Sequence, residues 1–97
     1  MKSSIGVVVV SYNSVQILGR CLESLIAQEG DYALDIVVVD NNSNDGSVDF
    51  VRTNFPGCEI IERKSNAGFG KAANQGAEYC ISQKCSHVMF LNPDSFL

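Results

Sequence analysis

Residues 5–14 read IGVVVVSYNS, an unbroken apolar run that gives way to polar residues. A strand that is apolar at every position is buried on both faces, which is typical of the interior of a parallel sheet. Residues 36–46, IVVVDNNSNDG, repeat the pattern, and Asp40 ends the apolar run before a stretch of turn-forming residues. The two stretches predict parallel strands whose polar ends lie at the same edge of one sheet.

Amphipathic segments separate the predicted strands. Ser14 is expected to cap a first helix that Gly30 ends, and Ser47 is expected to cap a second helix that Pro56-Gly57 ends. In each segment the apolar residues recur at helical spacing and form one stripe. The stripes consist of Val15, Leu18, Leu22, Leu25 and Ile26 in the first helix, and of Val48, Val51 and Phe55 in the second.

The second half of the chain continues the alternation. Residues 58–63 alternate partly, which predicts a third strand nearer the sheet edge. Residues 71–83 predict a helix, and residues 87–91 predict a fourth strand that ends before Pro93, which has no N–H to donate. The inner face of that helix is small, which lets it lie close to a sheet, and consists of Ala73, Gly76, Ala77 and Cys80.

This order of elements predicts an α/β fold over residues 1–97, expected to be a single domain. The fold is a Rossmann-like open parallel sheet with right-handed crossovers and helices on both faces. The apolar fraction of 45% and the mean hydropathy of +0.07 are typical of a globular chain. The net charge of −4 argues against nucleic acid as a partner, because binding phosphate backbones requires a basic surface. A single phosphate-bearing ligand remains compatible with this charge.

The chain shows no apolar run near the ~20 residues of a membrane helix, and its start does not resemble a secretory signal. His87 begins an apolar run and is interpreted as a strand-edge residue rather than a metal ligand. A cytoplasmic location is expected, and the full-length protein is expected to be cytoplasmic or peripheral to the inner face of the membrane. The cysteines form no C-x-x-C pair and are expected to be free thiols at Cys21, Cys58, Cys80 and Cys85.

Polar residues collect at the predicted carboxyl ends of the strands, where open α/β sheets bind ligands. The first strand leads into residues 11–13, the second ends at Asp40, and residues 66–71 form the turn before the third helix. The fourth strand leads to Asn92 and Asp94. The sequence therefore predicts a ligand site at this edge.

Three familiar nucleotide-binding patterns are absent. The first strand-to-helix turn, residues 11–14, has no glycine and so excludes a dinucleotide fingerprint. Gly70-Lys71 is followed by Ala72 instead of Ser or Thr, which excludes a P-loop. The first strand is followed by no acidic residues, which excludes a phospho-acceptor regulator.

Four segments, VVVVSYNS, VVVDNNSNDGS, NAGFGKAANQGA and FLNPDS, occur in an order and spacing that resemble the family 2 glycosyltransferases, which carry the GT-A fold. The last two segments are most similar to the rhamnosyltransferase branch. The resemblance implies that a nucleotide-diphosphate sugar, linked to dTDP or UDP, lies across the carboxyl edge. It also implies transfer to a glycan or lipid-linked acceptor.

The resemblance also assigns roles to residues. Residues 11–13 border the base, Asp40 takes hydrogen bonds from base or ribose, and the glycine-rich turn lines the pocket. Asp94 matches the metal-binding aspartate of the D-x-D motif and would hold Mg²⁺ or Mn²⁺, which prefer oxygen ligands. The implied donor-binding residues are Ser11, Tyr12, Asn13, Asp40, Asn66, Gly68, Phe69, Gly70 and Asn92.

Two positions depart from the family pattern. Asn92 replaces the first aspartate of D-x-D, which lowers the expected metal affinity, and Ala73 stands where many members have Arg. By resemblance, the chain is the donor-binding N-terminal portion of an inverting enzyme, without the acceptor half. The catalytic base is expected in that half, so no catalytic residue is assigned and the 97 residues alone are expected to be inactive. The sheet is expected to leave an open edge that favours self-association.

Other interpretations stay open at single residues. Asp40 and Asp94 could be ordinary turn residues, Asn13 could cap the first helix, and the glycines at 68 and 70 could serve packing or a positive φ. The alternative function is a non-catalytic nucleotide-binding α/β module, and a plain α/β interaction domain is a third reading.

Overall fold

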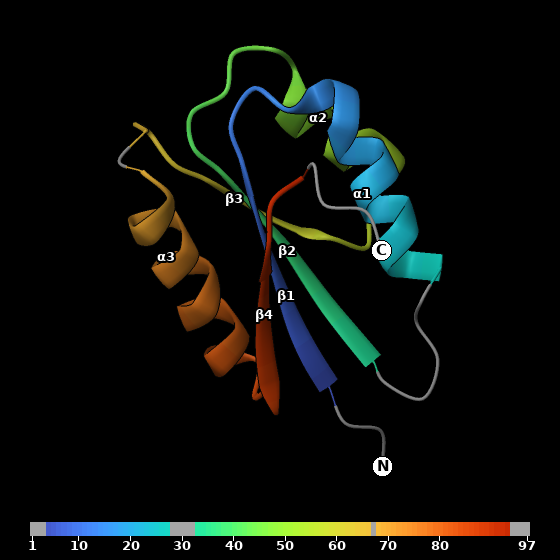
Figure 1. Cartoon of the computed structure of the whole chain (residues 1–97), viewed down its shortest axis with the longest axis vertical. Helices are drawn as coiled ribbons and strands as arrows, with labels where there is room; N and C mark the ends of the chain where they lie inside the picture. The colour runs from blue at the N-terminus through green and yellow to red at the C-terminus, as the bar shows by residue number, and fades with distance from the viewer. Residues whose placement is uncertain (1–3, 28–32, 67, 94–97) are drawn as a thin grey trace.

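The computed structural model describes residues 4–27, 33–66 and 68–93. Its parallel sheet has the order β3-β2-β1-β4, with helices on both faces, and this confirms the predicted fold class (Figure 1). The strands are β1 (Ser4–Ser11), β2 (Ala33–Asp40), β3 (Glu59–Glu62) and β4 (His87–Leu91). The helices are α1 (Val15–Ala27), α2 (Ser47–Asn54) and α3 (Phe69–Ser82).

The strand order reverses between β1 and β4. The chain moves outward from β1 to β2 and β3, and then returns across the sheet to place β4 on the other side of β1. Helices on the two faces of a sheet separate at such a switch point, and ligands bind outside the carboxyl ends of the strands there. The topology therefore selects the edge formed by the ends of β1, β2 and β4.

The bounds of β3 and α3 differ from the predicted ones. β3 is shorter than residues 58–63, because the Cys58 N–H donates to the Phe55 carbonyl in the turn after α2 (3.0 Å). α3 begins at Phe69 instead of Lys71, because Gly68 occupies the N-cap position with φ 92° and accepts from the Ala72 N–H (3.4 Å). The glycine-rich turn thus runs directly into the helix.

The face covered by α1 and α2 is packed with large aliphatic side chains. Val7 and Val9 of β1 point to this face, as do Ile36 and Val38 of β2. The predicted stripe of α1 is largely confirmed, although Ile26 is 47% exposed. Leu18, Leu22 and Leu25 of α1 are buried against the strands.

The face covered by α3 is packed with small residues. A Cβ atom at Gly76 would lie 2.4 Å from Cγ1 of Val8, so α3 approaches the sheet more closely than a helix with a side chain there could. The predicted small inner face is confirmed at Ala73, Gly76 and Cys80. Ala77 is only half-buried, and Ala72 is buried instead.

At the amino-terminal end of the sheet, residues near the starts of the strands are hydrogen-bonded to one another. The N–H and hydroxyl of Ser86 both donate to the Ser4 carbonyl (2.9 and 2.7 Å), and the Cys85 thiol donates to Asp35 (3.3 Å). Burial raises the pKa of Cys80 to about 11, so its thiol stays protonated at neutral pH. The four cysteines are free, as predicted.

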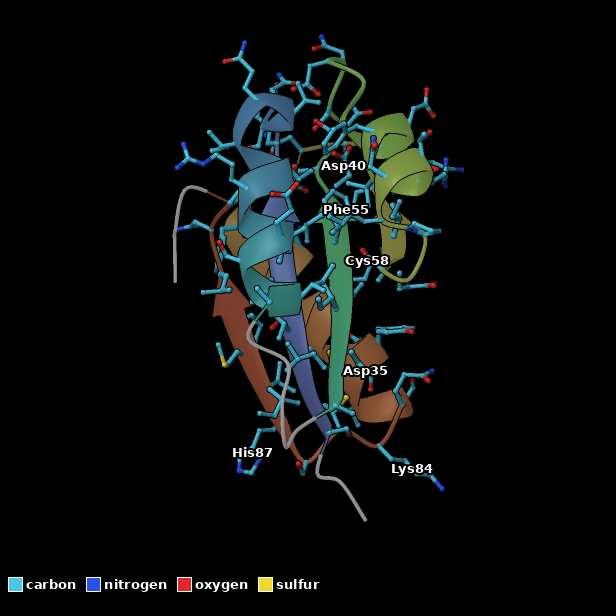
Figure 2. The ribbon with its side chains drawn as sticks, turned by 90° about the vertical axis from the view of Figure 1, so that its right-hand side faces the viewer. Asp35, Asp40, Phe55, Cys58, Lys84 and His87 are labelled. Carbon is cyan, nitrogen blue, oxygen red and sulfur yellow. The ribbon has the colours of Figure 1, made fainter. Side chains whose placement is uncertain are left out.

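Figure 2 shows Asp35 and His87 at this end of the sheet and Asp40 at the other. His87 is exposed at the start of β4, in agreement with its interpretation as a strand-edge residue. Among the helices of the described ranges, none combines the length and apolar composition that crossing a membrane requires.

Candidate functional site

The loops that follow β1, β2 and β3 come together at the carboxyl edge of the sheet (Figure 1). Ser11 lies opposite Asp40 in the β1–β2 register, and the Asn41 N–H donates to the Ser11 carbonyl (2.8 Å). The Arg63 N–H donates to the Asp40 carbonyl (2.8 Å), which extends the pairing beyond β3. The predicted donor residues of β1 and β2 are therefore adjacent.

Asp40 is buried, and its carboxylate is held by one neighbour. Ser43 donates to it twice, from its N–H to Oδ2 (2.8 Å) and from its hydroxyl to Oδ1 (2.7 Å). Side chains alternate along a strand, so Asp40 points to the same face as Ile36 and Val38, the face of α1 and α2. Figure 2 shows Asp40 at the end of β2, between α1 and α2 in that view.

Asn13 connects the loop after β1 to the loop after β2. Its N–H donates to the Ser43 hydroxyl oxygen (2.8 Å), and its side-chain Oδ1 accepts from the Asn44 N–H (2.9 Å). Asn13 has a φ of 49°, a left-handed conformation that asparagine adopts more readily than most residues. The side chain of Asn13 thus bonds to the neighbouring loop rather than capping α1.

Asp45 joins the amino-terminal ends of α1 and α2. Its Oδ2 accepts from the Val15 N–H (3.1 Å), and its Oδ1 accepts from the N–H (3.1 Å) and the hydroxyl of Ser47. Burial alone raises the pKa of Asp45, but the hydrogen bonds from Ser47 and Val15 lower it more, so the pKa lies below its ordinary value. Asp45 therefore caps two helices that are distant in sequence.

Of the two predicted serine caps, Ser14 is confirmed in position and Ser47 is wrong. Ser14 occupies the cap position, since its carbonyl accepts from the Leu18 N–H (2.9 Å), but its hydroxyl donates to the Tyr12 carbonyl (3.0 Å). Ser47 is the first residue of α2 rather than its cap, and Gly46 precedes it with a φ of 83°. Asp45 instead accepts from the first N–H of each helix, those of Val15 and Ser47, and provides the side-chain bond at both helix starts.

Three buried polar atoms of the described residues have no hydrogen-bond partner, and all three belong to the carboxyl edge. They are Oγ of Ser11, Oδ1 of Asn41 and Nε of Arg63. A buried polar group without a partner costs about 1–3 kcal/mol, so each of these atoms is a group whose cost a ligand would relieve. Arg63 is otherwise bonded through NH1 to Oε1 of Gln75 on α3 (2.6 Å).

Asn41 lies on the opposite face from Asp40. It is 3% exposed, and its Nδ2 donates to the Gly68 carbonyl (3.3 Å) at the start of α3. Asn41 is not among the residues predicted for the site, because the sequence places it in a run of turn-forming residues. The alternation of the strand carries the signal, since the residue after Asp40 must face the glycine-rich turn.

The glycine-rich turn lies beside Asn41. Oδ1 of Asn66 accepts from the Gly68 N–H (3.0 Å), and a Cβ atom at Gly68 or Gly70 would meet no atom within 4 Å. The aromatic rings of Phe69 and Tyr12 are about half exposed, at 48% and 50%. Open space beside backbone and two exposed rings is the composition expected where a planar ligand binds.

A separate hollow of about 290 Å³ opens between the end of β2, the start of α2 and the end of β3. Its lining includes Asp40, Asp49, Glu62 and Arg63, but neither Ser11 nor Asn41. Glu62 is paired with Arg52 across this side of the sheet (2.6 Å). The hollow is therefore rich in carboxylates and distinct from the place where the unpartnered acceptors lie.

The fourth strand leads to the predicted metal residues. Asn92 is exposed directly after β4, and Asp94, the predicted metal ligand, lies outside the described residues. Across the described ranges, no group of three His, Cys, Asp or Glu side chains could hold a metal ion.

An open parallel sheet with a polar carboxyl edge at its switch point defines a Rossmann-like α/β domain. The family model of glycosyl transferase family 2 matches residues 6–97, and this chain belongs to that family. The resemblance of the four sequence segments is thereby confirmed.

Among curated relatives, the poly(ribitol-phosphate) beta-glucosyltransferase of Bacillus spizizenii is 30% identical over 99 residues, covering 96% of this chain and 15% of that protein. Two solved structures are similar. One is the mannosyltransferase PcManGT from Pyrobaculum calidifontis in complex with GDP-Man and Mn²⁺, which is 26% identical with a TM-score of 0.69 over 81% of this chain and 25% of that chain. The other is S. aureus TarS 1-349 in complex with UDP-GlcNAc, which is 25% identical with a TM-score of 0.75 over 97% of this chain and 27% of that chain. The chain thus spans about a quarter or less of the length of these proteins.

Proposed function

We propose that this chain binds the nucleotide of a nucleotide-diphosphate sugar at the carboxyl edge of its sheet and forms the donor site of an inverting glycosyltransferase. Family membership supports glycosyl transfer as the activity of the whole protein. Similar chains have been solved with GDP-Man and with UDP-GlcNAc, which supports a nucleotide sugar as the ligand.

The observation that carries the proposal is the buried, unpartnered Oδ1 of Asn41 beside the turn at Gly68. The unpartnered Oγ of Ser11 lies on the other face, because Ser11 alternates with Val7 and Val9 of β1. Nδ2 of Asn41 is already bonded, so its Oδ1 is free to act as an acceptor only. The N3–H of uracil or thymine supplies a matching donor for the proposed UDP or dTDP ligand. The half-exposed ring of Tyr12 offers a surface on which a base can stack.

The remaining donor residues have supporting roles in the proposal. The space beside Gly68 and Gly70 admits the ribose and the first phosphate close to the backbone, and Asn66 holds the turn in shape through its bond to Gly68. Phe69 lies at the first position of α3 and is about half exposed. Asn13 contributes through the loop that carries Tyr12.

A divalent ion, Mg²⁺ or Mn²⁺, is proposed to be held by Asp94 with Asn92 beside it, and it would neutralise the charge of the diphosphate leaving group. In the transfer step the acceptor hydroxyl oxygen bonds to the anomeric carbon as the bond to the diphosphate oxygen breaks, and a carboxylate base takes the hydroxyl proton. None of the 97 residues is proposed as that base. The acceptor is a glycan or a lipid-linked glycan, the sugar is rhamnose or another hexose, and the location is cytoplasmic.

Calorimetric titration tests the proposal. UDP, dTDP and GDP are added to the chain in buffer with Mn²⁺, with Mg²⁺ and with EDTA. We expect UDP or dTDP to bind, and we expect Asn41→Ala and Tyr12→Ala each to weaken binding by about tenfold, as one hydrogen bond or one stacked ring is worth. Asn54→Ala, at the exposed end of α2, is the matched control and leaves binding unchanged.

Two results would contradict the proposal. Absence of binding by all three nucleotides in every buffer would remove the donor site, and parental binding by Asn41→Ala would move the site away from Asn41. Nucleotide binding by a full-length parent protein that transfers no sugar would favour the non-catalytic nucleotide-binding module instead.

A further inference from the structure

We propose that Asp40 and Ser43 are positioning residues, which hold the loop after β1 in its ligand-binding shape and do not themselves contact the nucleotide. The inference depends on the proposed function only where it is tested by nucleotide binding. It revises the direct role that the family resemblance implies for Asp40.

The first support is the direction of the Asp40 side chain. Its carboxylate points to the face of α1 and α2, where both oxygens accept from Ser43. The turn at Gly68, beside which the unpartnered oxygen of Asn41 lies, belongs to the face of α3. Consecutive residues of a strand point to opposite faces, so Asp40 and Asn41 cannot both face the same side of a bound base.

The second support is the hydrogen-bond path from Asp40 to the first loop. The Ser43 hydroxyl donates to Asp40 and accepts from the Asn13 N–H, at 2.7 and 2.8 Å. A hydroxyl has one hydrogen to donate, so Asp40 determines which way the Ser43 hydroxyl turns and leaves its lone pairs to accept from Asn13. Through Ser43, the buried carboxylate of Asp40 therefore helps to fix the backbone of Asn13 in place.

The third support is the conformation of Asn13. Its left-handed φ of 49° is less favourable than an extended or right-handed one, and it persists here with hydrogen bonds to both its N–H and its side chain. Tyr12 comes directly before Asn13 and is half exposed. If the bond from Asn13 to Ser43 is lost, the backbone at Asn13 relaxes and the ring of Tyr12 loses its fixed direction.

A double-mutant cycle on UDP binding tests the inference. We expect Asp40→Ala and Ser43→Ala each to weaken binding by about tenfold, and the double variant to be no weaker than the weaker single variant, because both changes break one path. Ser43→Thr keeps the hydroxyl and is expected to bind within about twofold of the parent. Asp40→Asn, which keeps the side-chain size and one acceptor oxygen, replaces Asp40→Ala if that variant does not fold.

A direct contact between Asp40 and the nucleotide gives a different result. Ser43→Ala would then bind like the parent, or the losses of the two single variants would multiply in the double variant. Either result would overturn the inference.

A measurement without ligand separates this inference from the proposed function. The amide of Asn13 is followed by NMR in the ligand-free parent, Asp40→Ala, Asp40→Asn and Ser43→Ala chains, with Asn54→Ala as the control. We expect the Asn13 amide to shift and to exchange faster in Asp40→Ala and Ser43→Ala, although Asp40 makes no bond to it. An unchanged Asn13 amide in Asp40→Ala would overturn the inference, whereas a parent chain that binds no nucleotide would overturn only the proposed function.

Discussion

The two faces of the sheet are packed by different means. On one face, Leu18, Leu22 and Leu25 of α1 pack against the strands. On the other face, α3 lies against Val8 and Val39 at Gly76. Substitutions that shorten a side chain should destabilise the first face most, because they leave a cavity. Substitutions that enlarge a side chain should destabilise the second face most, because they overpack it. The difference extends to the carboxyl edge, where Asp40 on the first face is enclosed by its own loop and Asn41 on the second face has an unpartnered oxygen.

The two faces of the sheet differ in the roles that we propose for them. The face of α1 and α2 forms a rigid frame, with Asp45 and Ser43 linking the loops above it. The face of α3 is proposed to carry the ligand, because the close approach of α3 brings the turn at Gly68 within hydrogen-bond distance of Asn41. Changes to the frame should alter stability first, and changes on the other face should alter packing and binding.

The largest effect is expected at the α1 face. Leu22→Ala removes a fully buried side chain and should lower the free energy of unfolding by about 3 kcal/mol, as buried Leu→Ala changes do. Urea denaturation followed by circular dichroism measures the loss. Ile81→Ala, on α3 and 68% exposed, is the control and should change stability by less than about 0.5 kcal/mol. Equal losses in the two variants would show that Leu22 is not part of the core.

A glycine pair compares the faces directly. Ala in a helix is favoured over Gly by about 1 kcal/mol, and this gain applies equally to Gly76 in α3 and Gly19 in α1. The new methyl at position 76 would lie 2.4 Å from Cγ1 of Val8, whereas at position 19 it would lie 3.0 Å from Cζ of the half-buried Phe50 ring. We expect Gly76→Ala to be less stable than Gly19→Ala by about 2 kcal/mol, since overpacking costs about 1–3 kcal/mol.

The glycine comparison has an internal check. Adding Val8→Ala to Gly76→Ala should restore part of the lost stability, because it removes the atom that the new methyl meets. A Gly76→Ala chain more stable than the parent would mean that α3 does not lie close to the sheet.

A smaller effect is expected at the helix junction. Asp45→Ala removes the acceptor of two helix ends and should cost about 1 kcal/mol at pH 7. The pKa of Asp45 is lowered from 3.8 by folding, so its charge stabilises the fold above pH 3.8, and this contribution is lost as pH falls through the lower folded-state pKa. Thermal unfolding of the parent and Asp45→Asn should therefore converge as the pH falls below 3.8. A constant difference from pH 7 to pH 2 would contradict the assignment.

The weakest effect is expected at the sheet edge formed by β4. β4 carries no Lys, Arg, Asp or Glu, and Met89 and Phe90 on its opposite faces are 41% and 47% exposed, whereas the β3 edge carries Glu59 and Glu62. Because the chain has a net charge of −4, a second copy meets least repulsion at β4, and we propose pairing of two β4 strands. Sedimentation at rising concentration should show dimers that Met89→Lys removes and Ile81→Lys retains. A monomer at all concentrations would contradict the proposal.

Much of the fold could be predicted because each strand and helix carries its own periodicity. The apolar runs at residues 7–10 and 36–39 are continuous, so their side chains need burial on both faces of the strand. A central strand of a parallel sheet provides that burial. The helix caps could not be predicted with the same success, since Asp45 reaches Val15 only after β1 and β2 have paired.

The sequence by itself determined the order of the elements, the parallel sheet and the edge at which polar residues gather, because hydrophobic periodicity and turn chemistry act over a few residues. Only the tertiary structure decided that Asp40 and Asn41 point to opposite faces with different partners, and that Ser43 joins Asp40 to Asn13. The bonds of Asn13 to Ser43 and of Asn41 to Gly68 connect residues 30 and 27 positions apart, and hydrogen bonds of that kind depend on how loops meet in space rather than on the composition of either loop.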